Sequence, residues 1–229
     1  MRLERLLLAA FGLALAGDLG SLLAGFTPGH TVCKPLLMPL LAGWAVCAWR
    51  ACGERAGRVP PLLVAALLFG WGGDVLLLFD AEPAFLGGMA SFAAGHVCYL
   101  LLFTRYGTAR PHTLPLGLAY GAALVGTVAL LWADLPAELR VPVAGYSLLL
   151  TAMAFRSARL GLAAGAGGAL FLLSDTLIAS GIAEWPQLPR PDFWIMLTYA
   201  AAQYLLARGV LATLNPTAAV PTTPARARP

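Results

Sequence analysis

The chain has 229 residues, of which 59% are hydrophobic and 11% are charged, and its mean hydropathy is +0.78. Soluble domains carry about 25% charged residues, so this composition excludes an ordinary water-soluble protein. The formal charge of +4 does not indicate a nucleic-acid partner, because the basic residues are spread over the predicted loops and form no patch.

Apolar runs of about 20 residues recur along the chain and predict an all-α, polytopic membrane bundle. We expect the first run to be a membrane span and not a cleaved signal, since no convincing cleavage site follows it. We expect eight transmembrane helices within residues 1–212 and a disordered tail, rich in Pro, Thr, Ala and Arg, at 213–229. The predicted spans are 4–24, 33–51, 60–79, 84–105, 113–132, 139–157, 161–180 and 191–211.

The loop charges predict how the bundle is oriented. Twelve of the 15 basic residues fall on the side that holds both termini. The other side carries three basic residues and six acidic ones, namely Lys34, Arg140, Arg190, Asp80, Glu82, Asp134, Glu138, Glu184 and Asp192. Because basic loops are cytoplasmic, we expect both termini in the cytoplasm and a multi-pass protein of a bacterial inner membrane.

Three acidic residues remain inside the predicted spans: Asp18, Asp74 and Asp175. Each lies about six residues, or about 9 Å, from the predicted outer end of its span. Lys34 opens the second predicted span at the same side. Charges at membrane depth are costly, so four at a shared depth indicate a functional site.

Small residues surround two of these carboxylates and allow their helices to approach closely. They are Gly70, Gly72, Gly73, Gly165, Gly167 and Gly168. If Asp74 and Asp175 come close enough to couple, the pair can hold one proton, which supplies an acid and a base from one residue type.

The fourth span has a face that carries aromatic and polar residues at helical spacing. It comprises Phe85, Gly88, Phe92, His96 and Tyr99. His96 is the candidate for hydrogen bonding or proton handling near the carboxylates. Weaker candidates lie on the sixth and eighth spans: Tyr146, Ser147, Tyr199 and Gln203.

Less specific interpretations stay open for each of these residues. The buried charges can simply pair to hold the bundle together, the aromatic face can be packing, and Lys34 can extend to the lipid headgroups. The cysteines show no metal-ligand spacing, so we expect no metal site. A proton-coupled transporter of a small molecule or lipid is the main alternative function. An intramembrane aspartyl protease is disfavoured, because Trp71 stands where its GxGD motif needs glycine.

Several of these motifs together resemble the YhhN-like lysoplasmalogenase family. They are Lys34-Pro35-Leu36-Leu37-Met38, Gly73-Asp74, the face that ends at His96 and Tyr99, and Ser174-Asp175. The resemblance implies an eight-helix membrane hydrolase that cleaves the vinyl-ether bond of lysoplasmalogens and needs no metal or cofactor. The expected products are a fatty aldehyde and a glycerophospho-alcohol. Asp74 and Asp175 match the family's proposed catalytic aspartates.

This chemistry fits the residues. Protonation of a vinyl ether at its β-carbon gives an oxocarbenium ion. A neutral Asp can donate this proton, and an ionised Asp can stabilise the cation that forms. Lys34 is expected to pair with the phosphate of the lysolipid. His96, Tyr99, Tyr146 and Asp18 complete the expected substrate-binding set.

Overall fold

A computed structural model describes residues 3–51, 60–107 and 113–214. The predicted tail lies almost wholly outside these residues. Within them the chain forms α-helices, one short 3-10 helix (η2) and no strand. The elements are α1 (Leu3–Ala24), α2 (Thr27–Arg50), α3 (Pro61–Leu76), α4 (Glu82–Tyr106), α5 (Thr113–Leu131), α6 (Ala137–Ser157), η2 (Ala158–Leu160), α7 (Leu162–Ile182) and α8 (Pro191–Leu214).

The predicted eight-helix membrane fold is confirmed. Among the described residues, seven helices are long and apolar enough to cross a membrane, and α3 is a shorter apolar helix. Backbone N–H and C=O groups find no water within a bilayer, and a helix satisfies them internally. This explains why each apolar run is helical along its whole length.

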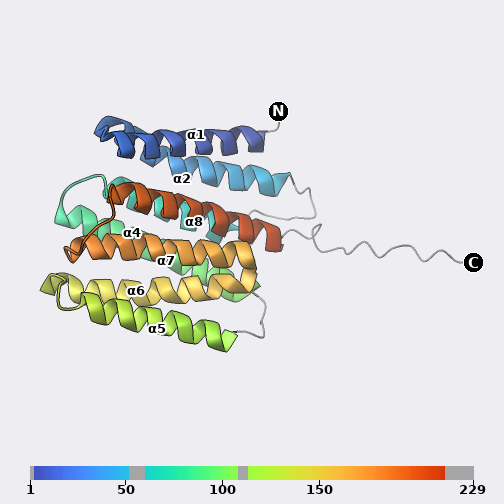
Figure 1. The fold of residues 1–229 in the computed structure, drawn as a ribbon. Coiled ribbons are helices and arrows are strands. Elements are labelled where there is room, and N and C mark those ends of the chain that lie inside the picture. The colour runs from blue at the N-terminus through green and yellow to red at the C-terminus, as the bar shows by residue number, and fades with distance from the viewer. Residues whose placement is uncertain (1–2, 52–59, 108–112, 215–229) are drawn as a thin grey trace, which may run out of the picture.

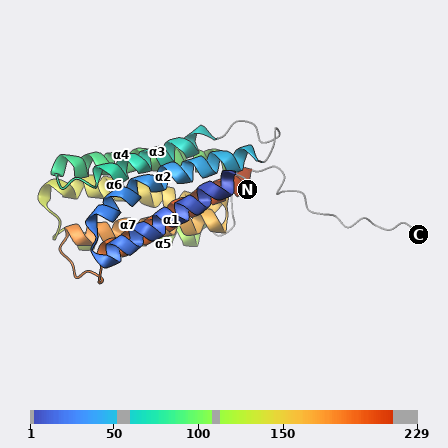
Figure 2. The ribbon, with the colours of Figure 1, turned by 90° about the horizontal axis from the view of Figure 1, so that it is seen from above.

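The helices lie side by side in the order α1, α2, α8, α7, α6 and α5 across the bundle, with α4 behind them (Figure 1). The view from above shows α3 and α4 along one side and α1, α5 and α7 along the other (Figure 2). The most extensive contacts pair α1 with α2, α3 with α4, and α7 with α8. The described residues begin with α1 and finish with α8 at one end of the bundle (Figure 1). The cytoplasmic position of that end stays a prediction.

Two of the predicted helix ends that are wrong concern site residues. The second helix begins at Thr27, six residues earlier than predicted, because Pro28 fits the first turn of a helix. Lys34 therefore lies seven residues inside α2 and is buried, and does not open the span. The third helix ends at Leu76, which places Asp74 in its last turn.

A proline inside α2 creates a hydrogen-bonding problem that α3 solves. Pro39 has no N–H to donate to the carbonyl of Pro35, one turn earlier. The indole N–H of Trp71 donates to that carbonyl instead, over 3.0 Å. The bond joins α2 to α3 three residues from Asp74, so it fixes α3 where the first of the two central carboxylates lies.

The main core lies between α2, α3, α4, α7 and α8, and the contact of α7 with α8 depends on two glycines. A Cβ added to Gly167 would lie 2.8 Å from the backbone nitrogen of Leu206 and 2.9 Å from the carbonyl oxygen of Ala202. A Cβ added to Gly209 would lie 2.7 Å from the backbone nitrogen of Ala164. The backbones of these two helices therefore pack directly on each other.

We predict that Gly167→Ala and Gly209→Ala each destabilise the fold by about 1–3 kcal/mol, because the added methyl group meets backbone atoms that cannot rotate away. The measurement is the thermal unfolding midpoint of the detergent-solubilised protein. Gly121→Ala on α5 is the matched control, since nothing lies within 4 Å of its added Cβ. Unfolding midpoints that are equal in all three variants would contradict the proposed backbone contact.

Candidate active site

Asp74 is held by a chain of hydrogen bonds that joins three helices. Its side chain is buried, and Tyr199 of α8 donates its hydroxyl to Oδ2 over 2.8 Å. Gln203, one turn further along α8, donates its amide to the Tyr199 oxygen over 3.4 Å. Tyr99 of α4 in turn donates to Gln203 Oε1 over 2.8 Å. Tyr99 therefore supports Asp74 indirectly.

A glycine on α3 makes room for this chain. A Cβ on Gly70, one turn before Asp74, would lie 2.8 Å from Gln203 Nε2 and 3.1 Å from the Tyr199 hydroxyl. A larger residue at this position would displace both groups. The glycines that the sequence places near Asp74 therefore admit polar side chains as well as a neighbouring helix.

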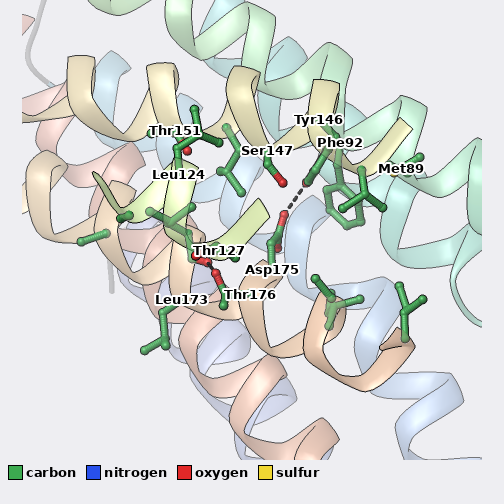
Figure 3. Close-up of a pocket in the computed structure, with 18 of the residues that line it drawn as sticks. Met89, Phe92, Leu124, Thr127, Tyr146, Ser147, Thr151, Leu173, Asp175 and Thr176 are labelled. Atoms are coloured by element: carbon green, nitrogen blue, oxygen red, sulfur yellow. Dashed lines mark hydrogen bonds between the residues drawn. The ribbon is translucent and has the colours of Figure 1, made fainter. Parts of the chain in front are cut away.

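Asp175 belongs to a second hydrogen-bonded group, on the other side of the core. The Tyr146 hydroxyl of α6 donates to Asp175 Oδ2, as the dashed line in Figure 3 shows. His96 Nε2 of α4 lies 3.0 Å from the same hydroxyl. Because the single proton of Tyr146 is directed at Asp175, His96 donates its Nε2 proton to the tyrosine oxygen. The three predicted residues thus form one continuous chain.

A cavity of about 290 Å³ opens beside Asp175, between α4, α5, α6 and α7. Its walls are mostly aliphatic and aromatic, and Asp175 is the one ionisable carboxyl group among its described lining residues. Figure 3 shows Asp175 and Tyr146 facing each other within it. Uncharged hydroxyls add the remaining polarity: Thr127, Ser147, Thr151 and Thr176. The buried Thr151 hydroxyl has no hydrogen-bond partner among the described residues.

An aromatic cluster connects Tyr199, the partner of Asp74, with His96, which belongs to the Asp175 group. The rings of Phe92 and Phe171 pack edge-on against Tyr199, with centroids 5.7 and 5.5 Å away. The His96 ring packs on Phe171 at 4.6 Å. Asp74 and Asp175 are each hydrogen-bonded to a tyrosine and not to each other, although Asp74 lies within electrostatic range of Asp175.

The two remaining predicted charges lie on α1 and α2, which contribute no residue to the cavity lining. Asp18 is fully buried, and its Oδ1 lies 2.8 Å from Nδ1 of His30. Its other oxygen has no partner among the described residues. Lys34 is 8% exposed, and both its charge and that of Asp18 lie within electrostatic range of Asp74. Neither residue lines the cavity beside Asp175.

The structure thus brings together Asp175, Tyr146 and His96, and it places Tyr99 in the Asp74 network. Of the residues on the predicted fourth-span face, Phe92, His96 and Tyr99 are buried. Sequence reasoning missed His30, because the predicted second span began after it. Among the described residues, no group of His, Cys, Asp and Glu could hold a metal ion.

Comparisons with known proteins identify the family. Residues 29–210 match the sequence model of the YhhN family. The chain is 38% identical to the lysoplasmalogenase TMEM86B of Homo sapiens over 157 residues, which cover 68% of this chain and 66% of that protein. It is 34% identical to lysoplasmalogenase TMEM86B of Rattus norvegicus over 179 residues, covering 78% and 71%.

A third relative, the lysoplasmalogenase TMEM86A of Bos taurus, is 30% identical over 171 residues, which cover 67% of each chain. The matched region thus spans about two thirds of the length of these curated relatives. No solved structure matches the chain. The family match covers most of the chain, including the helices that carry Asp74 and Asp175, α3 and α7, so this protein belongs to the YhhN family.

Proposed function

We propose that this protein is a membrane hydrolase that cleaves the vinyl-ether bond of lysoplasmalogen-type lysolipids. The observation that carries the proposal is the carboxyl group of Asp175, hydrogen-bonded by Tyr146 and facing an apolar cavity within the membrane domain. The relatives named lysoplasmalogenase support the substrate class. A bacterial inner membrane is the proposed location.

The reaction begins with proton transfer to a carbon atom of the substrate. Neutral Asp175 delivers its proton to the β-carbon of the vinyl ether, which breaks the C=C π bond and leaves an oxocarbenium ion. Water adds to this cation and returns a proton to the carboxylate. The resulting hemiacetal then separates into a fatty aldehyde and a glycerophospho-alcohol, so the net reaction consumes one water.

The hydrogen bonds around Asp175 suit this role. Tyr146 donates to Oδ2 and is itself supported by His96, which leaves Oδ1 to carry and deliver the proton. Because these hydrogen bonds already fix the carboxyl group, it loses less rotational freedom than a freely rotating one when the double bond is aligned against it. Ser147 and Thr151 line the same cavity and offer hydroxyls to the attacking water.

Asp74 supplies the second carboxylate. It does not line the cavity, but it lies within electrostatic range of Asp175. An ionised Asp74 stabilises the positive charge of the oxocarbenium ion through the low-dielectric interior. Tyr199 holds this carboxylate in place, and Lys34 and Asp18 set the charge around it.

The apolar part of the substrate has two neighbouring apolar surfaces to lie on. The cavity holds the reacting end of the alkenyl chain against aliphatic walls. Leu124 lines both this cavity and a second, wholly apolar groove of about 370 Å³ on α5 and α6. The rest of the chain lies along this groove, whose other walls include Val125 and Leu148.

We predict that Asp175→Asn and Asp74→Asn each lower aldehyde formation by about 100-fold or more, the usual contribution of a positioned acid or base. The measurement is product analysis with purified protein and lysolipids that carry a vinyl-ether, alkyl-ether or ester linkage. Asp80→Asn, at an exposed turn between α3 and α4, is the control and keeps full activity. Full activity in either site variant rejects its assigned role, and no aldehyde from the unmodified protein rejects the proposed function in favour of a carrier.

We predict that the aldehyde formed in D2O carries one solvent deuterium at C2, because the first step places a solvent-derived proton on carbon. Immediate reduction to the alcohol preserves the label for mass spectrometry. Aldehyde without deuterium would exclude protonation at carbon while leaving hydrolysis itself intact.

We predict that Tyr146→Phe lowers kcat by about 10- to 100-fold with little change in KM, because a hydrogen bond to the reacting carboxyl group is lost. Tyr120→Phe on α5 is the control, since Tyr120 packs on Phe155 and does not line the cavity. A rise in KM with unchanged kcat would instead assign Tyr146 to substrate binding alone.

A further inference from the structure

A small apolar cluster, separate from the main core, borders the cavity at its outer rim. This rim cluster comprises Leu131, Leu135, Val143 and Ala183. Val143 belongs to the cluster and also lines the cavity beside Asp175. Whatever part of a substrate extends outward from Asp175 along α6 therefore meets the rim cluster next.

A cation is anchored at this rim. Arg140 precedes Val143 by three residues on α6, so it lies on the same helix face one turn further out. Its Nε donates to the carbonyl oxygen of Leu135 over 3.1 Å, and its Nη2 donates to that of Ala133 over 3.2 Å. These bonds hold the guanidinium group against the turn between α5 and α6.

The guanidinium group of Arg140 has N–H donors that are not used in these two bonds. The two carbonyls use two of its five N–H groups, and it forms no ion pair with another described residue. The planar arrangement of N–H groups in a guanidinium matches the geometry of phosphate oxygens and can donate two parallel hydrogen bonds to them. Arg140 is half-buried and not capped by a carboxylate, so an anion at the rim can still reach it.

The spacing along α6 matches a lysolipid. Tyr146 is hydrogen-bonded to Asp175 and so lies at the same depth. It is six residues from Arg140 along α6, which corresponds to a rise of about 9 Å. In a lysolipid a glycerol unit and one ester oxygen separate the vinyl-ether oxygen from phosphorus, about 6–7 Å at ordinary bond lengths. With the double bond at Asp175, the phosphate comes within reach of the Arg140 side chain.

From this geometry we propose that Arg140 binds the phosphate of the substrate at the rim of the cavity. This assignment rests on the proposed function, since it names the group that recognises the headgroup of the same substrate. It replaces Lys34 in that role. Lys34 is buried on α2, a helix that contributes no residue to the cavity lining, and it already has Asp74 within electrostatic range.

Acidic residues around the same rim indicate the charge of the preferred headgroup. Asp134 accepts a hydrogen bond from the indole of Trp185 over 2.7 Å, and Trp185 packs on the rim cluster. Glu138 lies in the first turn of α6, and Glu184 directly follows Ala183. These carboxylates favour the ammonium group of a zwitterionic headgroup and repel a headgroup of net negative charge.

The test compares three alkenyl substrates in mixed detergent micelles: a lysophosphoethanolamine, a lysophosphoglycerol and a phosphate-free 1-alkenylglycerol. Arg140→Gln raises the KM for the lysophosphoethanolamine about 10-fold or more, because a hydrogen-bonded charge contact is lost. Its KM for the alkenylglycerol stays within about twofold, since that substrate has no phosphate to bind. The unmodified protein prefers the lysophosphoethanolamine to the lysophosphoglycerol.

Two variants make the comparison specific. Arg190→Gln changes another arginine of the same side, which lines a different pocket between the α1–α2 turn and α8, and leaves the KM for every substrate unchanged. Arg140→Lys keeps the charge and retains more of the headgroup preference than Arg140→Gln does. Because activity on the alkenylglycerol reports an intact fold in each variant, loss of headgroup binding is separated from misfolding.

Three outcomes overturn the assignment. Equal losses on the phosphate-containing and phosphate-free substrates in Arg140→Gln show a merely structural arginine. A rise in KM that is limited to the phosphate-containing substrates in Lys34→Gln, and is absent in Arg140→Gln, assigns phosphate binding to Lys34. Absence of cleavage of any vinyl ether by the unmodified protein rejects the proposed function itself, and the assignment of Arg140 with it.

Discussion

A carboxyl group that is removed from water must find hydrogen-bond donors within the protein, and this requirement governs how the helices meet around Asp74 and Asp175. Each carboxyl group takes a tyrosine hydroxyl from a different helix, Tyr199 from α8 and Tyr146 from α6. These bonds tie α3 to α8 and α7 to α6. The groups that we assign to catalysis are thus also groups that link one helix to another.

The two carboxyl groups nevertheless have different surroundings. Asp175 is half-buried beside a cavity, while Asp74 is enclosed by Tyr199 and the aromatic rings that pack on it. A substrate in the cavity can touch the first and can feel only the field of the second. This difference divides the work between them, with proton transfer at Asp175 and charge stabilisation from Asp74.

The sequence was sufficient to predict the eight helices and the residues that lie within them, because apolar runs and excluded charges are local properties. It also placed His96 and Tyr146 near the carboxylates, although not their hydrogen bond. It could not assign Tyr199 to Asp74 or Tyr146 to Asp175, since each pairing depends on how helices far apart in the chain rotate and pack.

Helix ends were harder to predict, for a physical reason. Pro28 can either end one segment or start the next, and only the packed chain shows that it starts α2. That choice moved Lys34 from the membrane surface into the protein and brought His30 against Asp18. The pairing of Arg140 with the α5–α6 turn has no sequence signal, because its acceptors are backbone carbonyls.

The indole of Trp71 has a consequence for how this chain can vary. It compensates for the amide proton that Pro39 lacks, so the two positions do not change independently. An aromatic ring without an N–H at position 71 leaves the Pro35 carbonyl without a donor in a hydrocarbon environment. A residue other than proline at position 39 supplies a backbone N–H to that carbonyl, so the indole donor is no longer needed. Substitutions at these two sites are therefore epistatic, although they lie on separate helices.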